Sequence, residues 1–155
     1  MQKRVISITV LNEHSVLARI SGLFAGRGYN IESLTVAPLM DSNLSYVSIS
    51  TRGDEKVLEQ IIKQLHKLIP VVSVGECEDV ITEELALLKF EINENLETIK
   101  SLISYCHNHI VSMNSRYIVF SVCDTPKKIS ELKNTLKQFN PKDMIRSGVV
   151  VMDKS

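Results

Sequence analysis

The apolar residues of this chain change their spacing in a fixed order, and that order occurs twice. In each half, segments with every second residue apolar alternate with segments whose apolar residues recur at helical spacing. The first spacing predicts strands and the second predicts amphipathic helices. Both halves are therefore expected to form the same series: strand, helix, strand, strand, helix, strand. This series is the split βαβ, or ferredoxin-like, plan.

The first copy of this pattern occupies about half of the chain. Ser15 is a candidate N-cap for its first helix, whose apolar face contains Val16, Leu17, Ile20, Leu23 and Phe24. Gly26 and Gly28 follow, and glycine tolerates the left-handed backbone that ends helices. Asp54 is a candidate cap for the second helix. The predicted strands are residues 4–11, 30–37, 44–51 and 71–74.

The second copy follows an acidic segment, residues 76–84, which is expected to be a linker. Its helices are expected to begin at Asn95 and at Thr125-Pro126. Its predicted strands are residues 85–92, 110–115, 117–123 and 145–152. We therefore predict an α+β protein with two ferredoxin-like βαββαβ domains in tandem, residues 1–78 and 79–155. Units of this size are marginally stable alone, so association within or between chains is expected.

Charge and composition exclude several classes of partner. The chain has 18 basic and 18 acidic residues, and each half is balanced. This balance argues against nucleic acid or an anionic membrane as a partner. No apolar run approaches the ~20 residues that span a bilayer, and no secretory signal is recognisable. Three widely spaced cysteines fit buried thiols in a reducing compartment. We expect a cytoplasmic protein.

Motifs that suggest chemistry lack the required context. The glycines at 22, 26 and 28 close a helix, whereas phosphate-binding glycines open one. His107 and His109 are expected on a helix, where residues two apart diverge, and no second ligand pair has zinc spacing. No catalytic nucleophile motif occurs. We therefore predict no catalytic residue, no metal and no cofactor in this chain.

A small zwitterion is the ligand that the remaining features favour. The loop from Asn12 to Ser15 precedes a helix N-terminus, whose free amides favour a carboxylate. Asn30 begins the next strand, and the first two strands are expected to be adjacent. An ammonium group would then meet the carbonyl oxygen of Asn12 or Asn30. Alternatively, both asparagines are only cap and turn residues, because Asn favours such positions without any ligand.

Several segments resemble the small regulatory subunit of acetolactate synthase, also called acetohydroxyacid synthase. These segments are Leu17 to Ala37 (LARISGLFAGRGYNIESLTVA), Gly53 to Ile61 (GDEKVLEQI), Lys63 to Leu68 (KQLHKL) and Arg146 to Val149 (RSGV). The resemblance is very specific over residues 3–76. From residue 77 to 155, chiefly length, element order and the terminal motif agree.

The resemblance implies an N-terminal ACT domain and a regulatory role. Such subunits bind the large catalytic subunit of acetolactate synthase, activate it, and confer feedback inhibition by valine. The large subunit, not this chain, would hold thiamine diphosphate, magnesium and flavin. Two ACT domains would pair edge to edge as a homodimer, with valine at their interface. One chain would supply Asn12, His14, Ser15 and Val16, and the other would supply Asn30 and Ile31.

Ser15 departs from the family pattern, which usually has glycine there so that the ligand carboxylate can approach the backbone closely. The serine adds bulk and a hydroxyl group, which either donates an extra hydrogen bond or hinders valine. The main alternative function is a free-standing amino-acid sensor that regulates another enzyme or a transcription factor. Co-purification with a large thiamine enzyme would distinguish the two.

Overall fold

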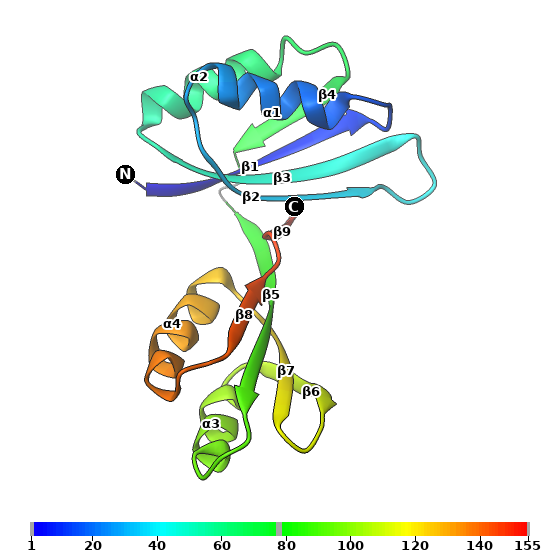
Figure 1. Ribbon diagram of the computed structural model, residues 1–155. Helices are drawn as coiled ribbons and strands as arrows, with labels where there is room; N and C mark the ends of the chain where they lie inside the picture. The colour runs from blue at the N-terminus through cyan, green and yellow to red at the C-terminus, as the bar shows by residue number, and fades with distance from the viewer. Residues whose placement is uncertain (1, 77–78, 155) are drawn as a thin grey trace. The chain divides into compact units, whose positions relative to one another are not determined.

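A computed structural model describes residues 2–76 and 79–154 of the chain (Figure 1). The chain divides into two compact units, residues 1–81 with 148–155 and residues 82–147. The predicted domain boundary lies between residues 78 and 79, and residue 78 is outside the described residues. Cys77, one of the three cysteines predicted to be buried thiols, is also outside them. The boundary therefore stays a prediction. Among the described residues, no helix is both long and apolar enough to cross a membrane.

The first unit contains a four-stranded antiparallel sheet in the order β2-β3-β1-β4. Helices α1 and α2 cover one face of this sheet (Figure 1). The order along the chain matches the predicted plan. The elements are β1 (Gln2–Leu11), α1 (Val16–Gly26), β2 (Ile31–Pro38), β3 (Leu44–Gly53), α2 (Glu55–Leu65) and β4 (Val71–Glu76).

Alternation and helical spacing place the core of the first unit where the sequence predicts it. Ile6, Ile8 and Val10 of β1 point to the helices and are almost completely buried. Helix α1 contributes most of the apolar face predicted for it, and α2 contributes Leu58, Ile61 and Leu65. Asp54 accepts a hydrogen bond from the Val57 amide at 2.9 Å as the predicted N-cap of α2. Leu17 is the exception, because it is 43% exposed and lies outside this core.

The predicted adjacency of the first two strands is wrong. β3 lies between β1 and β2, and every residue of β1 from Gln2 to Leu11 pairs with β3. The reason is topological, because β2 and β3 form a hairpin and β3 then inserts beside β1 in the split βαβ plan. β2 is consequently at one edge of the sheet.

The second unit repeats the plan, with a sheet in the order β6-β7-β5-β8 and helices α3 and α4 on one face (Figure 1). Phe90 and Phe120 meet edge to face in its core, with ring centroids 6.4 Å apart. Its elements are β5 (Val80–Glu91), α3 (Leu96–Ile103), β6 (His107–Met113), β7 (Tyr117–Asp124), α4 (Pro126–Leu136), a 3-10 turn (Lys137–Phe139) and β8 (Asp143–Arg146).

Four expectations about the second half are wrong in detail. The acidic segment is mostly strand, because β4 reaches Glu76 and β5 already begins at Val80. Asn95 occupies the N-cap position of α3 without a side-chain capping bond; the Asn93 side chain instead accepts from the Asn95 amide. The last strand is two strands, β8 and β9 (Val150–Asp153), separated by residues 147–149. His107 and His109 lie in β6 rather than in a helix.

The break between β8 and β9 has a local cause in the first unit. A Cβ on Gly148 would overlap the Thr35 hydroxyl and come within 2.9 Å of the Leu34 carbonyl oxygen. The neighbouring Val149 carbonyl accepts a hydrogen bond from the buried Ser48 hydroxyl. Val149 and Val151 are buried on this unit. The close approach of the backbone therefore requires glycine at position 148.

Candidate functional site

The loop between β1 and α1 is held by backbone hydrogen bonds. The Asn12 amide donates to the Asn43 carbonyl at 2.8 Å, and the Glu13 amide donates to the Leu11 carbonyl at 2.9 Å. These bonds place the loop beside the N-terminus of α1. The first turn of α1 contains no acidic residue. Its amides consequently present positive partial charge, which favours an anion.

Ser15 occupies the N-cap position of α1, but its side chain makes no capping hydrogen bond. Its φ angle of 69° puts it in the left-handed region, whereas a capping serine normally has extended backbone. The predicted side-chain cap is therefore wrong. The left-handed backbone also gives a physical reason for glycine at this position, because glycine adopts it without a Cβ penalty.

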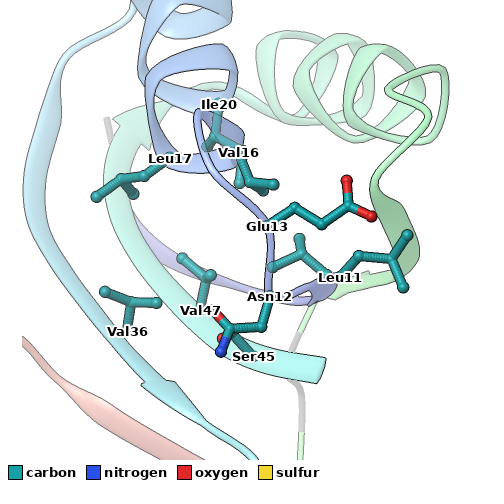
Figure 2. Close-up of a pocket in the computed structure, with 10 residues that line it drawn as sticks. Leu11, Asn12, Glu13, Val16, Leu17, Ile20, Val36, Ser45 and Val47 are labelled. Carbon is teal, nitrogen blue, oxygen red and sulfur yellow. The ribbon is translucent and has the colours of Figure 1, made fainter. Parts of the chain in front are cut away.

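A cavity of about 80 Å³ lies between this loop, α1 and the sheet (Figure 2). Its walls are mainly aliphatic, and Asn12, Ser45 and Val47 are among the residues that line it (Figure 2). The volume is several times the 10–15 Å³ or so that one water needs, so it can take a small branched side chain. The lining residues are Val10, Leu11, Asn12, Glu13, Val16, Leu17, Ile20, Val36, Ser45 and Val47.

The cavity includes two residues of the first predicted group, Asn12 and Val16, but not His14 or Ser15. Sequence reasoning missed Val36 and Val47 as cavity residues. Both lie on predicted strands, at positions that belong to the alternating apolar pattern. They are direct partners in the β2–β3 register. Only the register brings them together, and a single sequence does not specify it.

The second predicted group lies at the opposite end of α1. The Asn30 carbonyl accepts from the Thr51 hydroxyl at 2.7 Å, and Ile31 packs partly buried against the core. Because α1 has 11 residues, its ends are about 16 Å apart at roughly 1.5 Å per residue. One chain therefore does not bring Asn30 and Asn12 to the same small ligand.

Cys106 is buried and Cys123 is half-buried, and the surroundings of both thiols affect their reactivity. Burial raises the pKa of the Cys106 thiol, and the nearby Asp124 carboxylate raises it further. Burial also raises the pKa of the Cys123 thiol, with the Glu83 carboxylate adding to the effect. Both thiols consequently stay protonated at neutral pH, the opposite of an activated nucleophile.

His107 and His109 point to the same side of β6, because residues two apart on a strand share a face. The expectation that the two histidine side chains diverge, because they would lie on a helix, is therefore wrong. Within residues 2–76 and 79–154, however, no group of three His, Cys, Asp or Glu side chains is arranged to hold a metal.

The glycine-rich segment has the expected local geometry. α1 ends at Gly26, and Gly28 has a φ of 69°, which turns the chain toward β2. The Gly28 and Tyr29 amides donate to the Ala25 and Phe24 carbonyls and close the end of the helix. These amides are therefore used within the chain, as expected for a helix terminus rather than a phosphate-binding loop.

Comparison with known proteins matches each half of the chain to a protein-family model. Residues 6–73 match the family model described as an AHAS small subunit-like ACT domain, and residues 83–155 match the small subunit of acetolactate synthase. The chain is 36% identical over 159 residues to the acetolactate synthase small subunit of Buchnera aphidicola subsp. Baizongia pistaciae, covering 100% of both chains.

Two further relatives agree over nearly the whole length. The Escherichia coli K12 acetolactate synthase isozyme 3 small subunit is 36% identical over 156 residues, covering 98% of this chain and 96% of that one. The crystal structure of the acetolactate synthase small subunit from Thermotoga maritima has a TM-score of 0.89 at 29% identity, covering 100% of this chain and 99% of that one. The chain therefore belongs to the acetolactate synthase small-subunit family, with an ACT domain as its N-terminal half.

Proposed function

We propose that this chain binds and activates the large subunit of acetolactate synthase and confers feedback inhibition by valine. The large subunit would join two pyruvates into 2-acetolactate and CO2 in valine, leucine and isoleucine biosynthesis. Thiamine diphosphate, magnesium and flavin would belong to that subunit, and this chain would be its non-catalytic partner in the transferase. Family membership supports the regulatory role. The cavity beside the first turn of α1 is the observation that supports an amino-acid effector.

The chemistry of the cavity suits valine. The ligand carboxylate would accept hydrogen bonds from the first-turn amides of α1, while the isopropyl group would contact Val16 and Val47. Burying a valine side chain contributes about 1.5–3 kcal/mol. Each charge-assisted hydrogen bond contributes a further ~1.5–3 kcal/mol, and association entropy opposes binding by at least several kcal/mol. The balance gives the moderate affinity that suits a metabolite sensor.

A second copy would complete the site. β2 is an edge strand, and the cavity residues Leu17 and Val36 on its side are 43% and 45% exposed. Edge-to-edge pairing of two β2 strands about a two-fold axis would run the two copies in opposite directions. Asn30 of the partner subunit would then lie near Asn12, and its carbonyl oxygen would accept a hydrogen bond from the ligand ammonium.

Activity and calorimetry together test this function. The cognate large subunit should gain specific activity on addition of the chain, and valine should reduce that activity. Isothermal titration of the purified chain should show saturable binding that prefers valine over leucine and isoleucine, and Asn30→Ala should abolish it. Activation without any binding heat would retain the regulatory role but remove the valine site. No activation at all would favour the free-standing sensor.

A further inference from the structure

A buried serine on β3 lines the cavity beside α1. Ser45 is one of the residues around that cavity (Figure 2) and is only 4% exposed. It shares the inward face of β3 with Val47 and Ile49, which belong to the core of the first unit. Its register partner on β1 is Val10, another core residue. Ser45 is therefore a polar side chain at a position that otherwise belongs to the apolar core.

The Ser45 hydroxyl makes no hydrogen bond to any residue within 2–76 and 79–154. The other buried hydroxyl residues of β3 all form hydrogen bonds, and these are Ser48, Ser50 and Thr51. A buried hydroxyl without a partner costs free energy, because it gave up its bonds to water on folding. A polar group of a ligand in the cavity would remove that cost.

Ser45 lies at the end of the cavity that adjoins the N-terminus of α1. The Asn12 amide donates to the Asn43 carbonyl at 2.8 Å, which ties the start of β3 to the loop that precedes α1. Val16, the first residue of α1, lines the same cavity. The Ser45 hydroxyl and the first-turn amides of α1 are therefore two sets of hydrogen-bond donors around one small space.

We propose that the Ser45 hydroxyl binds the effector by donating a hydrogen bond to its carboxylate. This inference rests on the proposed function, in which the first-turn amides of α1 hold the same carboxylate. A carboxylate accepts several hydrogen bonds, and a hydroxyl bond to an ionised oxygen is roughly twice as strong as one between neutral groups.

The other groups of valine suit the Ser45 hydroxyl less well. The isopropyl group forms no hydrogen bond. The ammonium group only donates, so a bond to it would leave the hydroxyl hydrogen of Ser45 buried without an acceptor. The carboxylate is therefore the group that satisfies the Ser45 donor.

Ser45→Ala removes the hydroxyl and keeps the rest of the cavity wall. Isothermal titration of the full chain should show valine binding at least ~10-fold weaker, which corresponds to the loss of one charge-assisted hydrogen bond. Without valine, the melting temperature of the variant should equal or exceed that of the unmodified chain, because the hydroxyl has no partner in the fold to lose.

Ser50→Ala is the matched control. Ser50 is also a buried serine of β3, but its hydroxyl forms a hydrogen bond of 2.5 Å with the Ser33 hydroxyl and it does not line the cavity. This substitution should lower the melting temperature and leave valine affinity unchanged. The two serines are thus expected to show opposite effects on stability and on binding.

The outcomes distinguish this inference from the proposed function. No valine binding by the unmodified chain would overturn the proposed function, and the role of Ser45 with it. Unchanged valine affinity in Ser45→Ala would overturn the role of Ser45 alone. A lower melting temperature of Ser45→Ala without valine would also overturn that role, because the hydroxyl would then serve the fold.

Valinamide identifies the ligand group that Ser45 contacts. It keeps the ammonium and isopropyl groups of valine but has a neutral amide in place of the carboxylate. Ser45→Ala should therefore weaken valinamide binding less than valine binding, since the bond to a neutral carbonyl is the weaker one. Equal losses for the two ligands would overturn the assignment to the carboxylate.

Discussion

At the scale of single residues, Ser15 shows how a backbone angle limits a side chain's role. Its position before α1 is correct for a cap, but a φ of 69° prevents the usual capping geometry. Glycine at this position would adopt the same angle freely. The serine therefore strains the loop beside the proposed effector site.

We predict that Ser15→Gly stabilises the chain by about 0.5–1 kcal/mol. Relief of left-handed strain contributes roughly 1–2 kcal/mol, and the greater freedom of glycine in the unfolded chain offsets part of it. Urea unfolding followed by circular dichroism measures the change. Ser21→Gly is the control, because Ser21 lies exposed within α1 and the same substitution should destabilise there. A loss of stability in Ser15→Gly would contradict the strain argument.

Gly148 carries the second prediction at this scale. Gly148→Ala should destabilise the first unit by about 1–3 kcal/mol, because the added methyl would overlap the Thr35 hydroxyl and crowd the Leu34 carbonyl. Hydrogen exchange of the β2 and β3 amides measures the effect. Gly22→Ala is the matched control: its Cβ would meet nothing within 4 Å, so stability should rise by up to about 1 kcal/mol. Equal effects at both positions would refute close packing at Gly148.

At the scale of elements, two helices begin with the same kind of residue but use it differently. Asp54 caps α2 through its carboxylate, whereas Asn95 makes no side-chain cap for α3. Both residues were predicted as caps from the same sequence signal. The difference arises because Asn93 supplies its side-chain oxygen to the Asn95 amide, and Asn95 itself has helical backbone angles.

We predict that Asp54→Ala destabilises the first unit by about 0.5–2 kcal/mol, the usual cost of losing an N-cap. Asn95→Ala should change stability much less, because it removes no capping bond. Thermal unfolding of the two variants, measured side by side, makes the comparison. An Asn95→Ala variant as unstable as Asp54→Ala would mean that Asn95 caps α3 in solution.

At the scale of the whole molecule, the terminal motif from Arg146 to Val149 contributes to each compact unit. In the second unit, the Nε and Nη2 groups of Arg146 donate to the two carboxylate oxygens of Glu84, whose side chain is only 3% exposed. A buried carboxylate without its partner is strongly destabilising. The motif in the sequence therefore corresponds to an ion pair joining β5 and β8.

We predict that Arg146→Met destabilises the second unit by about 3–5 kcal/mol. Adding Glu84→Gln should restore part of the loss, because the uncompensated charge is then removed. Hydrogen exchange of the β5 amides reports on this unit. Lys100→Met, which breaks an exposed ion pair with Glu97, is the control and should cost less than about 1 kcal/mol. No rescue by Glu84→Gln would argue that Arg146 acts through packing alone.

Much of the fold was predictable from local pattern. Residues such as Ile6, Ile8 and Val10 alternate, and Leu58, Ile61 and Leu65 follow helical spacing. Both spacings are properties of neighbouring residues, so one sequence reveals them. The break at residues 147–149 and the early start of β5 at Val80 were not predictable in this way, because pairing partners distant in sequence decide them.

The sequence by itself determined the two βαββαβ repeats, the helix that ends at its glycines, and the resemblance that led to the family. These depend on short-range spacing and residue type. Only the tertiary structure decided that β3 separates β1 from β2, that Val36 and Val47 close the cavity, and that Asn12 and Asn30 lie at opposite ends of α1. Strand order and register depend on contacts between distant segments, which no local pattern contains.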